Sequence, residues 1–155
     1  MKRHFVVAAA LMMACKTDDR QADARPTRAE TVRTPRDIAR EAMPSVLVLS
    51  LRDANAQPLS MGSGFVVRSG VVATNAHVVI GSASGSAKDL VTAEEIPIDG
   101  VLAIDERMDL ALLSIASKRP PLSLRLGSAP DIGEELYAIG NPEGLEGTFS
   151  DGILS

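Results

Sequence analysis

Two residues of this chain have side chains suited to acid–base catalysis, and each is bordered by apolar residues. His77 lies in the run Thr-Asn-Ala-His-Val-Val at 74–79, and Asp109 precedes the aliphatic run Leu-Ala-Leu-Leu at 110–113. In serine-dependent acyl transfer, a histidine takes the proton of the attacking hydroxyl and an aspartate fixes the tautomer of its imidazole. We therefore interpret His77 as a candidate general base and Asp109 as its candidate orienting carboxylate.

Each residue alone also has an ordinary structural explanation. A histidine between apolar residues is more often structural than catalytic, and an aspartate before a strand is usually a turn or strand-edge residue. The order His77 then Asp109 is one of the three known triad orders, and it places the serine last. No Gly-x-Ser-Gly-Gly segment occurs in the 155 residues. The sequence thus predicts two members of a triad without their nucleophile.

Four serines are weak substitutes for that nucleophile. Ser63 lies in a Gly-Ser-Gly segment that precedes His77, and Ser82, Ser84 and Ser86 lie in a run of small residues without an oxyanion-hole motif. We expect none of them to act as a nucleophile. We therefore predict that the 155-residue polypeptide by itself has no peptidase activity.

Other kinds of chemistry find little support. The chain has two histidines and one cysteine, too few for a zinc site built from such ligands. It has neither a phosphate-binding loop nor a dinucleotide fingerprint, so we expect no metal and no cofactor. Residues 41–155 carry seven Lys and Arg against fifteen Asp and Glu. An acidic domain of this kind does not favour a nucleic-acid partner.

The N-terminus has the pattern of an export signal. Lys2 and Arg3 precede ten apolar residues at 5–14, which suits a secretory signal but is short for a membrane-spanning helix. Ala14 directly before Cys15 resembles a bacterial lipoprotein cleavage box. We expect residues 1–15 to be a lipoprotein-type signal with Cys15 as the lipidated residue; the alternative is an ordinary signal peptide. Residues 16–33 have no apolar periodicity and are predicted to form a disordered tether.

The remaining sequence, 34–155, predicts an all-β domain after one short helix. Thr34, Pro35 and Asp37 favour a helix start, and Pro44 requires the helix to end by residue 43. Short extended runs then alternate with Gly and Pro turns, which is typical of a barrel or sandwich. We place six strands in a first barrel at about 45–117, at residues 45–51, 60–67, 71–74, 90–92, 96–105 and 110–115. Residues 81–88 are predicted to be a flexible loop, and two or three strands at about 122–155 would only begin a second barrel.

Several segments in this order resemble the trypsin-like serine protease superfamily, and most of all its bacterial HtrA (Deg) branch. They are Ser-Val-Leu-Val at 45–48, Gly-Ser-Gly-Phe-Val-Val at 62–67, Val-Ala-Thr-Asn-Ala-His-Val-Val at 72–79, Asp-Leu-Ala-Leu-Leu at 109–113, Leu-Gly-Ser at 126–128, Ala-Ile-Gly-Asn-Pro-Glu-Gly-Leu at 138–145 and Thr-Phe-Ser-Asp-Gly-Ile-Leu-Ser at 148–155. The resemblance implies a chymotrypsin-like double β-barrel with His77 as general base and Asp109 as orienting carboxylate. In that family the nucleophile segment and oxyanion hole follow the strand matched by 152–155.

Two functions follow as hypotheses. The first is an N-terminal fragment of an HtrA-like serine endopeptidase, exported to the bacterial cell envelope and anchored there by lipid. Its partners would be polypeptide substrates and the membrane, and an oligomer is compatible with the sequence. The second is a non-catalytic envelope lipoprotein that uses the barrel as a binding or scaffold module. The DNA beyond codon 155 would separate the two, because only the first requires a nucleophile segment.

Overall fold

The computed structural model describes residues 33–127, 129–140 and 147–155. The predicted signal, Cys15 and nearly all of the predicted tether lie outside these residues. The described part begins with helix α1 (Pro35–Ala42), which has the predicted capping box. The Thr34 side chain accepts from the Asp37 backbone, and the Asp37 side chain accepts from the Thr34 backbone. The helix ends before Pro44, as predicted, and a 3-10 turn, η1 (Met43–Ser45), leads into the first strand at Val46.

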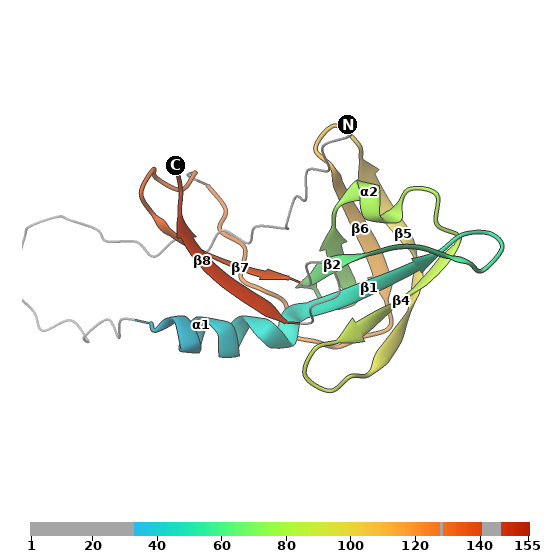
Figure 1. The fold of residues 1–155 in the computed structure, drawn as a ribbon, viewed down its shortest axis with the longest axis horizontal. Helices are drawn as coiled ribbons and strands as arrows, with labels where there is room; N and C mark the ends of the chain where they lie inside the picture. Colours follow the sequence, from blue (N-terminus) through green and yellow to red (C-terminus); the bar gives the residue numbers. More distant parts are fainter. Residues whose placement is uncertain (1–32, 128, 141–146) are drawn as a thin grey trace, which may run out of the picture.

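Six antiparallel strands form a closed barrel, which confirms the all-β prediction. They are β1 (Val46–Arg52), β2 (Pro58–Arg68), β3 (Val71–Thr74), β4 (Ser84–Asp89), β5 (Glu95–Asp105) and β6 (Leu110–Ile115). The strand order is β1-β2-β3-β6-β5-β4, and β4 pairs with β1 to close the ring (Figure 1). Closure leaves no unpaired edge in this sheet.

The barrel interior is aliphatic and tightly filled. Leu47, Leu49 and Leu113 have no exposed surface, and most of the other buried members of this cluster are Val, Ile and Ala. Gly64 shows why a glycine is needed at one crowded position. A Cβ there would lie 2.6 Å from Val72 Cγ1 and 3.0 Å from a Leu49 methyl, so any side chain would force the core apart.

One predicted element was misplaced. The sequence predicted a flexible loop at 81–88 and a strand at 90–92, whereas β4 occupies Ser84–Asp89 and residues 90–92 form a turn. Small residues suit this strand because β1 lies very close: a Cβ on Gly85 would meet Ser50 O at 2.8 Å and a Leu51 methyl at 2.7 Å. Packing against a neighbouring strand thus overrides the low strand propensity of Gly, Ser and Ala.

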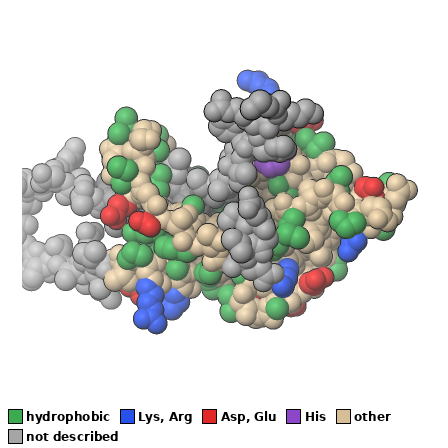
Figure 2. Space-filling model, in the orientation of Figure 1, with side chains coloured by type: hydrophobic (Ala, Val, Ile, Leu, Met, Phe, Trp, Pro, Cys, Tyr) green, Lys and Arg blue, Asp and Glu red, His purple; other side chains and the backbone are tan. Residues whose placement is uncertain are grey.

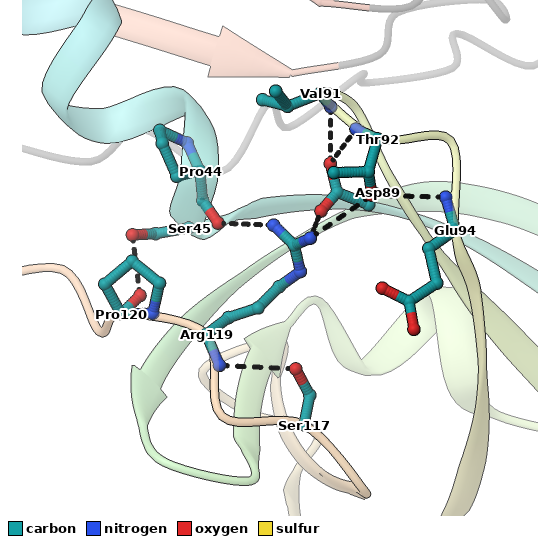
Figure 3. A network of polar contacts seen from close by, with 9 residues as sticks. All are labelled: Pro44, Ser45, Asp89, Val91, Thr92, Glu94, Ser117, Arg119 and Pro120. Atoms are coloured by element: carbon teal, nitrogen blue, oxygen red, sulfur yellow. Dashed lines mark hydrogen bonds and ion pairs between the residues drawn. The ribbon is translucent and has the colours of Figure 1, made fainter.

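A buried ion pair lies at the end of β4, in a polar network that joins three segments (Figure 3). The Asp89 carboxylate is 1% exposed and forms an ion pair with the Arg119 guanidinium. It also accepts hydrogen bonds from the backbone N–H groups of Val91 and Thr92. Arg119 donates in addition to the Pro44 carbonyl at 3.0 Å. The ion pair therefore connects the turn after β4, η1 and the segment that follows β6.

The segment 118–121, which contains two prolines and follows β6, is attached to the rest of the chain at further points. Ser45 Oγ donates to the Pro120 carbonyl at 2.7 Å, and the Leu122 N–H donates to the Val66 carbonyl at 2.9 Å. These two hydrogen bonds attach the segment to η1 and to β2. The direction in which the chain leaves the barrel is therefore fixed.

Beyond the barrel, two strands pair with each other: β7 (Glu135–Gly140) and β8 (Thr148–Ile153). This sheet lies beside α1, to one side of the barrel, and β7 also contacts β1 and β2 (Figure 1). Ile139 of β7 is buried in a second cluster with Ala42, Val46 and Leu122. On the face shown in Figure 2, hydrophobic side chains of the described residues reach the surface, and Lys and Arg occur in small separate groups.

Candidate active site

His77 is presented by a one-turn helix that is firmly anchored. Helix α2 (Ala76–Val79) buries Ala76, Val78 and Val79 and leaves the side chain of His77 57% exposed. Ser60 Oγ donates to the Val78 carbonyl from β2. A Cβ on Gly62 would lie only 2.7 Å from a Val78 methyl, so glycine is required for α2 to approach β2. Three buried apolar residues thus fix the orientation of the fourth.

Asp109 is brought to His77 by the register of two antiparallel strands. Thr74, the last residue of β3, pairs with Ala111 near the start of β6, so the residues after β3 lie beside those before β6. Asp105 Oδ1 accepts from the N–H groups of Arg107 and Met108 and forms the tight turn before β6. Asp109 follows this turn with φ +50°, a left-handed conformation that aspartate tolerates better than most residues.

The two predicted site residues are in direct contact. His77 Nδ1 lies 2.7 Å from Asp109 Oδ2, and the His77 backbone N–H donates to Asp109 Oδ1 at 2.9 Å. Asn75 Nδ2 donates to Asp109 Oδ2 at 3.1 Å. The backbone N–H of His77 is the largest influence that lowers the pKa of Asp109, and the His77 and Asn75 side chains lower it further, against a smaller opposing effect of desolvation. The carboxylate is therefore ionised at neutral pH.

An ionised carboxylate fixes the tautomer of the neutral imidazole. Asp109 Oδ2 can only accept a hydrogen bond, so His77 Nδ1 carries the proton and Nε2 keeps its lone pair. The ring is more than half exposed at the rim of the barrel. This arrangement can take a proton from a hydroxyl brought to Nε2.

Asn75 is a site residue that the sequence analysis missed. The sequence pattern around His77 assigns Asn75 no role. Its side chain reaches Asp109, 34 positions further along the chain. The one available sequence signal was an asparagine at the start of a helical turn two residues before the candidate base.

The four serines named as weak substitutes lie on β2, on β4 and in the loop that follows α2. Ser63 lies on β2 opposite Val48, and Ser82 Oγ donates to the Val79 carbonyl at 2.7 Å. Ser84 and Ser86 lie on β4, which the strand order places three strands away from β3. No group of three or more His, Cys, Asp or Glu within the described ranges is arranged to hold a metal ion. None of the described helices has the length and apolarity needed to span a membrane.

Comparison with known proteins identifies the family. A model of the trypsin-like peptidase domain matches residues 62–155. The chain belongs to the trypsin-like peptidase family. This match begins within β2 and runs through β8, and it includes His77 on α2 and Asp109 directly before β6.

The relatives of this trypsin-like peptidase domain place it in the HtrA branch. It is 33% identical over 134 residues to mitochondrial serine protease HTRA2 of Bos taurus, covering 77% of this chain and 27% of the relative. It is 38% identical over 109 residues to a probable periplasmic serine endoprotease DegP-like of Brucella suis, covering 67% of this chain and 21% of the relative. The chain thus spans about a quarter of the length of these curated relatives.

A solved structure supports the same fold. The serine endoprotease from Yersinia pestis matches with a TM-score of 0.70 and 27% sequence identity, over 81% of this trypsin-like chain and 46% of that chain. The predicted chymotrypsin-like architecture is confirmed: a closed six-stranded barrel, a short helix and a second sheet of two strands.

Proposed function

We propose that this chain carries the acid–base half of an HtrA-like serine endopeptidase. His77 would take the proton of the nucleophilic serine through Nε2 as the hydroxyl attacks the peptide carbonyl, and would then give it to the leaving amine. Asp109 would hold the imidazole in the required tautomer and stabilise the imidazolium that forms. In the second step His77 would take a proton from water as the water attacks the acyl-enzyme carbonyl, and would return it to the serine oxygen as the C–O bond breaks. The contact between His77 Nδ1 and Asp109 Oδ2 at 2.7 Å carries this proposal.

The nucleophile and oxyanion hole are proposed to come from a segment that these 155 residues do not include. No Gly-x-Ser-Gly-Gly segment is present in the sequence. Removing a triad serine lowers kcat by about 10⁶-fold, and the residual rate depends on the oxyanion hole. We therefore expect the 155-residue polypeptide to be inactive by itself.

The substrates are proposed to be polypeptides, and the site of action to be the bacterial cell envelope. The DegP-like relative is described as a periplasmic endoprotease, and residues 1–15 have the pattern of an export signal. Lipid attachment at Cys15 would anchor the protein, because each buried CH₂ of an acyl chain contributes about 0.8 kcal/mol. Labelling cells with a palmitate analogue tests the anchor: Cys15→Ala should abolish incorporation, and unchanged labelling would contradict it.

Peptidase activity is tested in two steps. If the DNA beyond codon 155, read in any frame, encodes Gly-x-Ser-Gly-Gly, the protein translated through it should hydrolyse unfolded casein. His77→Ala should lower kcat by about 10⁶-fold, and Asp109→Asn should lower it by about 10⁴-fold. His4→Gln and Asp99→Asn are the matched controls and should retain activity.

Two outcomes would contradict the proposal. Labelling of the 155-residue chain by a serine-directed phosphonate at Ser63 would show that a nucleophile is already present. Absence of any nucleophile segment in the downstream DNA, together with a stable and abundant short protein, would favour the binding-module hypothesis instead.

A further inference from the structure

Asn75 occupies the N-cap position of α2 but does not act as its cap. Its backbone is extended, with φ −77° and ψ 144°, as an N-cap residue requires. Asparagine is favoured there because its side-chain oxygen accepts an N–H of the first helical turn. In this protein the side chain makes no such bond.

The cap is supplied instead by Asp109. The N–H of His77, the second residue of α2, donates to Asp109 Oδ1 at 2.9 Å. The Asn75 side chain is thereby left to bond elsewhere, and its Nδ2 donates to both the Asp109 carbonyl oxygen and Oδ2 at 3.1 Å. A single amide nitrogen thus connects the backbone and the carboxylate of the same residue.

These hydrogen bonds restrain the backbone and the side-chain rotamer of Asp109, which the residue's own conformational preferences would leave free to change. A left-handed backbone is uncommon for a residue other than glycine, and an aspartate side chain about one-third exposed has room to change rotamer. The bond to the carbonyl oxygen holds the backbone, and the bond to Oδ2 holds the carboxylate plane. With Oδ1 committed to the His77 backbone, Oδ2 stays directed at His77 Nδ1.

We propose that Asn75 is a positioning residue that fixes the carboxylate of Asp109, and through it the tautomer and orientation of the His77 imidazole. The inference rests on the proposed function only where it takes His77 to be the general base. The positioning itself is a property of the folded chain and is measurable without substrate. A residue that merely capped α2 would have a different signature, because serine and aspartate cap helices as well as asparagine does.

The test uses the 155-residue protein in a His4→Gln background, so that His77 is its one histidine. Long-range ¹H–¹⁵N spectra report which ring nitrogen of His77 carries the proton, and ¹³C carboxyl shifts report the titration of Asp109. Asn75→Ser keeps a capping residue that is too short to bridge both oxygens of Asp109. Asn75→Asp keeps the shape, cannot donate, and adds a negative charge beside Oδ2. Asn55→Ala, in the exposed loop between β1 and β2, is the matched control.

We expect the proton to lie predominantly on Nδ1 in the parent protein and in the Asn55→Ala control. In Asn75→Ser the Nδ1–H to Nε2–H tautomer ratio should fall roughly tenfold, the effect of one hydrogen bond to a charged group. The pKa of Asp109 should rise in Asn75→Ser because a donor is lost. It should rise further in Asn75→Asp because a like charge is added.

Unchanged spectra in Asn75→Ser and Asn75→Asp would overturn the inference, because the Asn75 side chain would then have no effect on the Asp109 carboxylate or the His77 imidazole. That result would leave the proposed function intact, since casein hydrolysis dependent on His77 is measured separately. Conversely, altered tautomer ratios together with hydrolysis that survives His77→Ala would support the positioning and refute the proposed function. The two failures are thus distinguishable.

Discussion

In the barrel every strand is paired on both sides, whereas β7 and β8, among the described residues, pair only with each other. The barrel strands enclose a buried aliphatic cluster, in which Leu47, Leu49 and Leu113 have no exposed surface. In the two-stranded sheet only Ile139 is buried, and it is covered by residues of α1, β1 and the segment after β6. The barrel therefore has a core made of its own residues, whereas the buried residue of the two-stranded sheet packs against residues outside that sheet.

This difference bears on the candidate site. Asn75, His77 and Asp109 all follow or precede strands of the closed barrel, and the bonds that join them run between the ends of β3 and β6. The contact of His77 with Asp109 therefore needs nothing from β7 or β8. Under the proposed function, the barrel alone would set the acid–base pair, and a segment outside these 155 residues would bring the serine to it.

The largest expected contrast comes from deleting one aliphatic side chain in each region. Leu49→Ala should lower the free energy of unfolding by about 3 kcal/mol, because it opens a cavity in a closed core. Ile153→Ala on β8, where the side chain is 68% exposed, should change it by less than about 0.5 kcal/mol. Urea unfolding followed by circular dichroism measures both. Equal losses would show that the two-stranded sheet contributes to the same core.

The connection between the regions should respond asymmetrically to loss of its ion pair. Arg119→Met leaves the Asp89 carboxylate buried without its counter-charge and should cost about 3 kcal/mol. Asp89→Asn should cost about 1 kcal/mol, because asparagine can still accept from Val91 and Thr92 and the partly exposed Arg119 can reach water. The double variant should recover part of the loss in Arg119→Met. A larger cost for Asp89→Asn than for Arg119→Met would contradict this account.

A third comparison adds one methyl group to a glycine of each region. Gly64→Ala should cost about 2 kcal/mol, since the new Cβ would lie 2.6 Å from Val72 Cγ1 in the barrel. Gly152→Ala on β8 places its Cβ in open space and should stay within about 0.5 kcal/mol of the parent. Thermal unfolding midpoints measure both. A destabilised Gly152→Ala would reveal packing on β8 that the described residues do not show.

The sequence predicted the parts of this fold that depend on near neighbours. The α1 capping box needs residues three apart, and the strands β1, β3 and β6 are short apolar runs with high strand propensity. The fourth strand was misplaced because Gly85 and its small neighbours have the composition of a loop. They form a strand because β1 lies so close that larger side chains would not fit. The ion pair of Asp89 with Arg119 escaped notice for the same reason, since its partners lie 30 positions apart.

The residues of the candidate site also divide into those that the sequence predicted and one that it did not. His77 and Asp109 were identified by residue type, order and family resemblance, and the structure brings them into contact. Asn75 was missed because its bonds depend on Asp109 being left-handed and on the register of β3 with β6. Neither property can be read from the residues around Asn75.

The smallest expected effect is a pH dependence that separates an aspartate of the barrel from one of the two-stranded sheet. The pKa of Asp109 is lowered chiefly by the His77 backbone N–H. A carboxyl whose pKa is lower in the folded state stabilises the fold above its unfolded pKa, roughly 3.9, and loses that contribution as the pH falls through the folded value. Asp109→Asn suits the left-handed backbone, so it removes the charge with little strain.

The free-energy difference between the parent and Asp109→Asn should therefore be present near pH 6 and shrink as the pH falls below about 4. Partial exposure of the carboxylate keeps the effect small, because water screens its interactions. Asp151→Asn on β8 is the control for loss of one negative charge. Urea midpoints measured from pH 6 to pH 2 give both curves. Parallel curves for the two variants would mean that the bonds to His77 and Asn75 add nothing to the stability of the barrel, and that their role is confined to orientation of the imidazole.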